Sequence, residues 1–357
     1  MTLGEISMCN IAGYIGKRRA APILCEMMKK QEGYGGGYYT GITTHDGKKL
    51  NSVKVVGDMA DFLNETDGIK FEGNMGFLHS RSKSGGDVRW GHPFVSSDGT
   101  LSYIANGTAG VFLNEETDKK RCELALELEK KGYVFSSKTE GVISNYPHLS
   151  DGTAIHMSDL ACQHISCLVN NGMATDEAMS CSFSYIPSEV VGLVMRQQIP
   201  DRIFVTRINF PMMIGISEDG DTYLATTALA FPEDVKFRII ESLPPASTVE
   251  VFEGGYKLSP HALAIRSIAP LTPDIWHRVY VRLEEFLTGR QSDPVAVQDA
   301  IDACDDIWDK DSVPQSSVAV YEVLRAFKKE GRLHTVRVEA QGAFDGYKTD
   351  NFKIYIR

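Results

Sequence analysis

The second half of the chain contains a succession of short, β-rich apolar segments, and this succession restricts the fold more than any other feature. From Glu189 onward, six such segments follow one another with turn signals between them: EVVGLVMRQ, RIFVTR, PMMIGIS, DTYLATT, VKFRIIE and STVEVFE. The first half has strand-like segments of its own, such as CNIAGYIG, and helical patterns over 20–32, 114–132 and 158–172. Strands and helices do not alternate as in a Rossmann sheet, so we predict an α+β domain in which helices cover sheets.

The last part of the chain has a different organisation. A stretch rich in Gly and Pro over 254–273 is typical of a linker. Helical patterns follow near 274–289, 294–309 and 315–330, and the final residues RLHTVRVEAQGAFDGYKTDNFKIYIR have the pattern of a β-hairpin. This order predicts a small winged-helix-like α+β domain at 270–357. Acidic residues outnumber basic ones there, so we expect it to serve interaction or homo-oligomerisation rather than binding of a phosphate backbone.

Composition excludes several classes of function. The net charge of −10 argues against a nucleic-acid binder, and no apolar run approaches the roughly 18–20 residues that cross a bilayer. The residues MTLGEISM lack the basic and apolar regions of a secretory signal. Seven cysteines, none in C-x-x-C spacing, suit a reducing cytoplasm better than a disulfide framework or a zinc site.

Two features resemble ligand sites only superficially. The glycine-rich GYGGGY (33–38) is followed neither by Lys-Ser/Thr nor by a clear helix, so we expect a turn and no phosphate loop. His79 and His92 have no partner histidine at helical spacing, and we therefore expect no metal there. No cofactor is predicted.

Cys9 raises the main chemical question of the sequence. A free α-amine has a pKa near 8 and can act as the general base for the thiol of the same residue, but only if that cysteine is the first residue. Residues 1–8 would then be an extension or propeptide that is removed, or translation would begin at Met8 and the methionine would be cleaved. With residue 8 attached, the Cys9 nitrogen is an amide and this mechanism fails. The simpler interpretation is a buried structural thiol.

Several motifs in unbroken order over residues 9–258 decide how we interpret Cys9. The segments CNIAG, GFLHSRSKSGG (76–86), His92-Pro93, LSYIANGTAG (101–110), SSKTEGVI (136–143) and RINFPMMIGISEDGDTYLATTALAF (207–231) resemble motifs of the class II glutamine amidotransferases, which are N-terminal-nucleophile (Ntn) hydrolases. The glutaminase domain of glucosamine-6-phosphate synthase is the most similar. The resemblance implies the four-layer αββα sandwich of Ntn hydrolases for residues 9–258.

The resemblance also implies roles for individual residues. Cys9 would be the nucleophile, and the Asn106 side chain and Gly107 backbone N–H would form the oxyanion hole. Arg81 would hold the substrate α-carboxylate, a task suited to a planar guanidinium. The remaining positions at the substrate would be Ser82, Ser84 and Lys138.

The departures from the family pattern concern substrate recognition. Lys138 stands where the family has the aspartate that binds the α-ammonium of glutamine, and Ser82 replaces a loop tryptophan. A lysine would repel an ammonium group. Three functions therefore remain open. The chain could release ammonia from glutamine through a Cys9 thioester for a separate synthase subunit, since the family's isomerase domains are absent. It could hydrolyse another small-molecule amide, or it could be an inactive binding or regulatory protein on the same scaffold.

Overall fold

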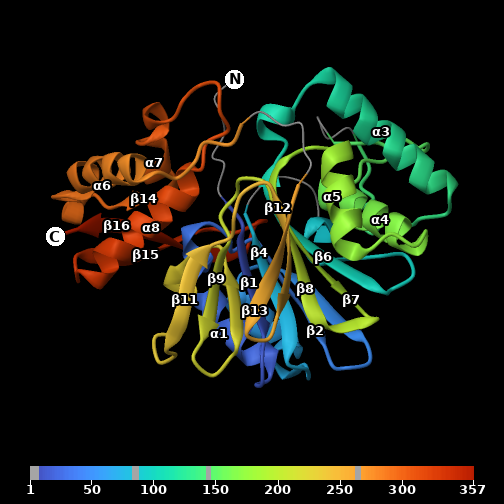
Figure 1. Cartoon of the computed structure of the whole chain (residues 1–357), viewed down its shortest axis with the longest axis horizontal. Helices are drawn as coiled ribbons and strands as arrows, with labels where there is room; N and C mark the ends of the chain where they lie inside the picture. The colour runs from blue at the N-terminus through green and yellow to red at the C-terminus, as the bar shows by residue number, and fades with distance from the viewer. Residues whose placement is uncertain (1–7, 83–87, 142–145, 262–266) are drawn as a thin grey trace.

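Two packed antiparallel sheets form the centre of the structure, a computed structural model that describes residues 8–82, 88–141, 146–261 and 267–357 (Figure 1). The first sheet has seven strands in the order β11 (Phe237–Ser242), β9 (Met213–Ser217), β10 (Thr222–Ala225), β1 (Asn10–Ile15), β4 (Met75–Arg81), β2 (Tyr39–His45) and β3 (Leu50–Val56). The second sheet has six strands in the order β13 (Gly255–Pro260), β12 (Ser247–Phe252), β8 (Ile199–Arg207), β7 (Glu189–Arg196), β6 (Leu101–Thr108) and β5 (Phe94–Val95).

Helices cover the outer face of each sheet, so the sandwich has four layers. Helix α1 (Ala20–Gln31) packs on the seven-stranded sheet, where Leu24 and Met28 join a buried cluster with Tyr14 and Leu78. Helices α4 (Met157–Asn170) and α5 (Thr175–Tyr185) pack on the six-stranded sheet, with α3 (Glu115–Lys130) against α4 and α2 (Met59–Glu65) beside β3. A separate apolar cluster fills the space between the sheets. The predicted αββα architecture is therefore confirmed.

The ends of several helices follow from capping side chains. Asp58 caps α2, and Asn114 caps α3 in a reciprocal pair with Thr117. His156 accepts the Ser158 N–H at the start of α4. These caps satisfy backbone donors that the first turn of a helix leaves without partners.

The C-terminal module consists of α6 (Pro273–Leu287), β14 (Val295–Ala296), α7 (Val297–Asp302), α8 (Ser316–Lys329), β15 (Leu333–Gln341) and β16 (Lys348–Ile356). Three helices followed by a hairpin are the predicted order, and the three strands form a sheet in the order β14-β16-β15. The helix expected at 294–309 is wrong in length. Val295 pairs with Ile354 of β16, so the chain after Pro294 first forms a strand, and α7 is only six residues long.

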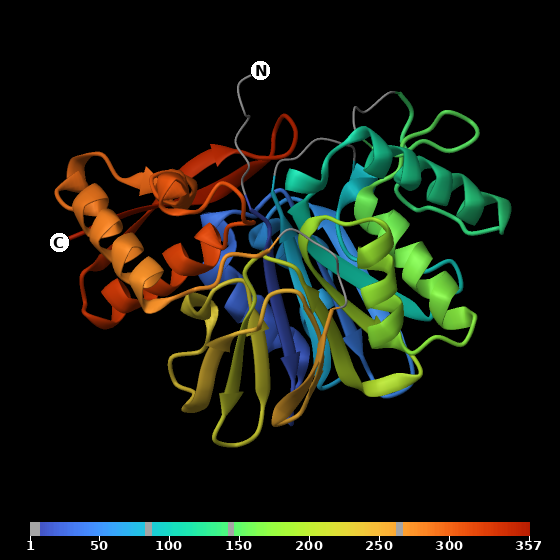
Figure 2. The ribbon, with the colours of Figure 1, turned by 45° about the horizontal axis from the view of Figure 1, so that its top comes forward.

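The module packs against the sandwich, as Figure 2 shows. Its buried cluster includes three residues that precede the module in the chain, Met8, Leu229 and Ala269. Met8 is only 6% exposed. Helix α8 has buried residues on both sides, and the Tyr321 ring of this helix lies 6.2 Å from the ring of Tyr34. Residue 8, directly before the candidate nucleophile, is thus held by helices from the opposite end of the chain.

A buried arginine reinforces the same junction. Arg207 at the end of β8 is 1% exposed and has no carboxylate partner in the described part of the chain. Its guanidinium donates to Oε1 of Gln315 at the start of α8 and to backbone carbonyl oxygens of Asn209, Phe210 and Leu243. Burial lowers the pKa of Arg207 to about 9. Uncharged acceptors from both parts of the molecule therefore hold one cation at their boundary.

The glycine-rich segment 33–37 lies beneath the β15–β16 hairpin. A Cβ atom on Gly33 would be 2.2 Å from Cδ1 of Phe352, and one on Gly37 would be 2.0 Å from Oγ1 of Thr349. Tyr34 packs edge-on against Phe352 at 5.0 Å. The predicted turn is present, and close approach of the hairpin explains why residues 33 and 37 are glycines.

We expect Gly33→Ala to destabilise the fold by about 1–3 kcal/mol, because the added methyl group overlaps Phe352. Chemical denaturation measures the free energy of unfolding. Phe352→Ala in the same chain should recover part of the loss, since it removes the ring atoms that the methyl group meets. Equal destabilisation by Gly33→Ala in both backgrounds would contradict this packing.

Among the helices that the structure describes, we find none with the length and apolar composition needed to traverse a lipid bilayer.

Candidate active site

The candidate nucleophile lies where the two sheets approach each other. Cys9 directly precedes β1, the strand between β4 and β10 in the seven-stranded sheet, and it is partly buried. Its Sγ is 3.4 Å from the backbone N–H of Ser82 and 3.5 Å from the Ser82 hydroxyl. Ser82 follows the last residue of β4. The structure therefore brings the predicted residues Cys9 and Ser82 into direct contact.

Asn106 joins this pair from the second sheet. It lies near the end of β6, is 1% exposed, and its Oδ1 accepts the backbone N–H of Cys9 at 3.2 Å. The other end of the same amide, Nδ2, is buried and has no hydrogen-bond partner in the described residues. A buried donor without a partner costs about 1–3 kcal/mol, and a ligand that supplies an acceptor would recover this free energy. The N–H₂ group of Asn106 is therefore available to an oxygen of a bound ligand.

Gly107, the second predicted oxyanion residue, follows directly and is exposed. A Cβ atom there would be 2.3 Å from the backbone oxygen of Glu189 on the neighbouring strand β7. Close strand packing thus requires glycine at this position, whatever its role in binding.

Arg81 is held between aromatic rings. It ends β4, is 1% exposed, and its guanidinium carbon lies 4.9 Å from the ring centroid of Tyr39 and 5.9 Å from that of Trp90. Tyr39 is opposite Arg81 in the β2–β4 register. Phe344, in the turn of the β15–β16 hairpin, lies 6.3 Å from the Tyr39 ring. The C-terminal module therefore reaches the surroundings of the predicted carboxylate-binding residue.

The predicted substrate residue Lys138 is directed away from this site. The Lys138 ammonium lies 2.9 Å from Oδ2 of Asp151 and 3.8 Å from Oε1 of Glu129, and its side chain is 39% exposed. We find no contact of Lys138 with Cys9 or Arg81 in the part of the chain that the structure describes. Ser84 lies outside the described residues.

Trp90 and Tyr146 are wall residues that the sequence did not reveal. The Trp90 indole N–H lies 2.8 Å from the backbone oxygen of Ser137 and from the hydroxyl of Thr139, which fixes the segment that contains Lys138. Tyr146 packs on Trp90 with ring centroids 4.5 Å apart. Burial raises the pKa of Tyr146, and charges at Arg81 and Cys9 are near enough to modify it. Only the His92-Pro93 pair marked this region in the sequence.

Buried histidines contact β6, the strand that carries Asn106. Nε2 of His79 lies 2.8 Å from the carbonyl oxygen of Ala105, and because a carbonyl only accepts, His79 donates this bond. Ala105 directly precedes Asn106. The rings of His79 and His92 are 4.1 Å apart. Burial lowers the pKa of His79 to about 3 and holds the pKa of His92 and of His156 well below the usual value, so the three rings are neutral.

No group of three or more His, Cys, Asp or Glu side chains arranged to hold an ion occurs in the residues described.

A buried carboxyl group lies behind the site. Glu32 accepts the Ser80 hydroxyl at 2.7 Å and the Met59 N–H at 3.0 Å, and its backbone oxygen accepts the Asn10 side chain at 3.2 Å. Ser80 and Asn10 are the neighbours of Arg81 and Cys9. Burial raises the pKa of Glu32 to about 7. Protonation of this group therefore differs between the folded and unfolded chain at mild pH.

We expect Glu32 to make the protein less stable as pH rises from about 4.5 to about 7. The folded chain binds the proton more tightly than the unfolded chain, so stability is greatest below the unfolded pKa and falls as Glu32 ionises. The decline is roughly 3 kcal/mol and levels off above pH 7. Urea unfolding of Glu32→Gln and of the unmodified protein at pH 5 and pH 8 measures it. A variant with the same pH dependence as the unmodified protein would refute this role.

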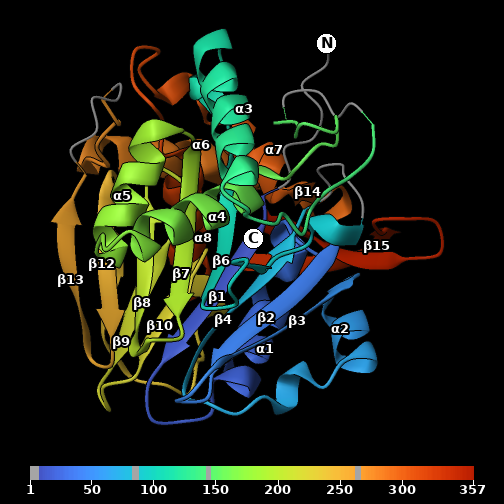
Figure 3. The ribbon, with the colours of Figure 1, turned by 90° about the vertical axis from the view of Figure 1, so that its right-hand side faces the viewer.

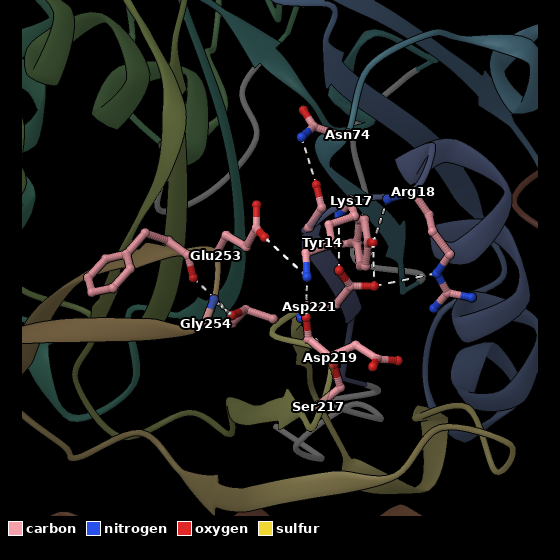
Figure 4. Close-up of polar contacts among 12 residues, drawn as sticks. Tyr14, Lys17, Arg18, Asn74, Ser217, Asp219, Asp221, Glu253 and Gly254 are labelled. Atoms are coloured by element: carbon pink, nitrogen blue, oxygen red, sulfur yellow. Dashed lines mark hydrogen bonds and ion pairs between the residues drawn. The ribbon is translucent and has the colours of Figure 1, made fainter.

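A second polar cluster occupies the opposite end of β1 (Figure 4). Asp221 accepts the Tyr14 hydroxyl at 2.8 Å and the Lys17 N–H at 2.9 Å, and lies 3.4 Å from Nε of Arg18. The Lys17 ammonium donates to the backbone oxygen of Asp219 at 2.6 Å. Lys17, Arg18, Asp219 and Asp221 line a surface cavity of about 650 Å³. The hydrogen bonds of Lys17 tie the turn after β1 to the β9–β10 turn.

Comparisons with known proteins agree with the fold. No family model matches the chain. The glutamine–fructose-6-phosphate aminotransferase of Clostridium acetobutylicum is 28% identical over 216 residues, which cover 60% of this chain and 31% of that enzyme. The corresponding enzyme of Chlorobaculum tepidum is 28% identical over 230 residues, covering 63% and 33%. The chain thus spans about a third of the length of these relatives.

Solved structures show the shared architecture. Glutamine phosphoribosylpyrophosphate amidotransferase from B. subtilis, complexed with ADP and GMP, superposes with a TM-score of 0.57 at 16% identity over 92% of this chain and 66% of that chain. A structure of the allosteric regulatory enzyme of purine biosynthesis superposes equally well, over 88% and 63%. The fold is that of the glutamine amidotransferases with an Ntn-type sandwich. With the aminotransferases as sequence relatives, the resemblance to class II glutamine amidotransferases is confirmed.

Proposed function

We propose that this chain hydrolyses a carboxamide and releases ammonia through a thioester on Cys9. One observation carries the proposal: Asn106 binds the Cys9 nitrogen through Oδ1 and keeps a buried Nδ2 donor without a partner beside the thiol. A catalytic oxyanion hole needs a preorganised donor at the point where negative charge develops, and the unpartnered Nδ2 group supports this role for Asn106.

The reaction follows from these positions once Cys9 carries a free amine. The amine takes the thiol proton, and Sγ attacks the amide carbon. The carbonyl oxygen gains the negative charge and accepts a hydrogen bond from Asn106 Nδ2, with the Gly107 N–H as the second proposed donor. Collapse of this intermediate breaks the C–N bond, the ammonium of Cys9 gives its proton to the departing ammonia, and water then hydrolyses the thioester to a carboxylate.

Arg81 supports a substrate that carries a carboxylate. Its guanidinium is buried between Tyr39 and Trp90, and a buried cation of this kind suits a planar anion. The Lys138 ammonium pairs with surface carboxylates, and the family's acidic residue is absent at that position. We therefore favour an ω-carboxamide with a carboxylate but without a free α-ammonium, and glutamine itself is the alternative substrate.

The test compares amides that differ only at the α-carbon. Protein that begins at Cys9 is supplied with glutamine, N-acetylglutamine and glutaramate, and ammonia is measured. We expect release from at least one of them, with the two amides that lack the ammonium preferred. Arg81→Met should raise KM about ten- to hundredfold, because charge-assisted hydrogen bonds to the carboxylate are lost, whereas Arg278→Met on α6 should leave it unchanged. No turnover, together with no labelling of Cys9 by a diazoketone analogue of glutamine, would overturn the proposal.

A second candidate has its own specific observation. Met8 is buried by the C-terminal module, and in the described chain the Cys9 nitrogen is a peptide amide. If residues 1–8 remain attached in cells, the chain is a binding or regulatory protein on this scaffold. Intact-mass spectrometry of protein from its native cell distinguishes the candidates by the first residue.

If the chain is an enzyme, we expect a separate synthase subunit to consume the ammonia that it releases.

A further inference from the structure

Strand β15 lies at the exposed edge of the three-stranded sheet, and it has few of the features that normally prevent an edge strand from pairing with another chain. It ends the sheet order β14-β16-β15, and its residues 335–339 are exposed on both faces. Val336 is 38% exposed and Val338 is 42% exposed. The strand, LHTVRVEAQ, contains neither proline nor lysine, the residues with which edge strands are commonly protected. Figure 3 shows the hairpin of β15 extending beyond the body of the molecule.

The order of side chains along β15 is complementary to itself. Arg337 and Glu339 flank Val338 on either side. In an antiparallel pair of two β15 strands with a two-fold axis at Val338, each Arg337 lies opposite Glu339 of the second copy. Val336 lies opposite Ala340 in the same register. Opposite charges and apolar residues at facing positions are the pairs that stabilise antiparallel strands.

Contacts within the hairpin pair the charges of this edge only diagonally and in exposed positions. Glu339 lies directly opposite Asp350 of β16, and like charges at facing positions are unfavourable. Arg337 reaches Asp350 only diagonally, at 3.4 Å, and Lys348 reaches Glu339 diagonally at 2.7 Å, both in exposed positions. Arg337 of a second copy would place a positive charge on the other side of Glu339.

We propose that two copies of this chain associate through β15, with a two-fold axis at Val338, and join their three-stranded sheets into one. The partner is a second copy because a two-fold interface must be complementary to itself, and the Arg337–Val338–Glu339 order has this property. Main-chain hydrogen bonds along the edge supply affinity, and the charge pairs set the register. The proposal does not depend on the activity of Cys9.

Charge reversal tests the interface and its register. In sedimentation velocity over a concentration series, the unmodified chain should dimerise. Arg337→Glu and Glu339→Arg should each weaken dimerisation at least about tenfold. In either variant, residues 337 and 339 of the two copies carry like charges at facing positions. An equimolar mixture of these two variants should form a heterodimer, and the double variant Arg337→Glu/Glu339→Arg should dimerise again. Arg278→Glu on α6 is the control and should dimerise as the unmodified chain does.

Three results would overturn the proposal. The unmodified chain could remain monomeric throughout the series. Both single variants could dimerise as well as the unmodified chain, which would assign the dimer to another surface. The third result would be that the mixture and the double variant both stay monomeric. The loss of dimer in the single variants would then come from damage to the hairpin and not from repulsion between like charges.

Discussion

Protein that begins at Cys9 should release ammonia from its amide substrate about 10²- to 10⁴-fold faster than protein that keeps residues 1–8, the range that a well-placed general base contributes. The reason is the nitrogen that Asn106 holds at 3.2 Å. As an amine this atom takes and returns a proton, and as a peptide amide it has no basic lone pair. Both forms can be made from one fusion by placing the protease site before Met1 or directly before Cys9.

The control for this comparison is the shortened chain with Cys9→Ala, which should be inactive. Removal of residue 8 should also lower the free energy of unfolding by about 2 kcal/mol or more, because Met8 is buried in the cluster of the C-terminal module. Activity and stability should therefore change in opposite directions. Equal rates for the long and short forms would show that the amine is not the base.

Asn106→Ala in the shortened chain should lower kcat about 10²- to 10³-fold, as loss of a single oxyanion donor does elsewhere. The substitution removes the unpartnered Nδ2 donor together with the Oδ1 acceptor that orients the Cys9 nitrogen. Steady-state kinetics separate kcat from KM, and KM should change little because Arg81 still holds the carboxylate.

Asn106→Asp refines this result. It keeps an oxygen for the Cys9 amine but places negative charge where the oxyanion develops, so kcat should fall at least as far. Asn74→Ala is the matched control, since Asn74 bonds the Gly16 carbonyl at the far end of β1. A variant at position 106 with full kcat would remove Asn106 from the oxyanion hole.

The architecture was largely predictable because apolar periodicity is local. The segments CNIAGYIG and EVVGLVMRQ became β1 and β7, and the pattern over 20–32 became α1. The error at 294–309 has a non-local cause. Pairing with β16, which lies more than fifty residues further along, draws residues 295–296 into a strand, and no window around Pro294 contains that information.

The residues of the candidate site could be predicted from the sequence only where they belong to a recognisable motif. The order of Cys9, Ser82 and Asn106 predicted three residues that the fold brings together. Tyr39 and Trp90 were missed because their role depends on the register between β2 and β4 and on packing across it. Lys138 was assigned to the substrate from its place in a motif, whereas its ammonium is directed to Asp151. Electrostatic partners across a surface loop leave no periodic trace in the sequence.

The burial of Met8 by helices from the far end of the chain has a consequence for timing. Residue 8 leaves the ribosome on the order of tens of seconds before α6 is synthesised, and until the C-terminal module folds, the residues of that cluster cannot cover it. A peptidase has access to the Met8–Cys9 bond during that interval. Once folding is complete, a residue only 6% exposed is protected. If a peptidase removes residues 1–8, each molecule would be committed during its own synthesis, and the cell would hold two long-lived populations. Their ratio would depend on the rate of cleavage relative to the rate of folding.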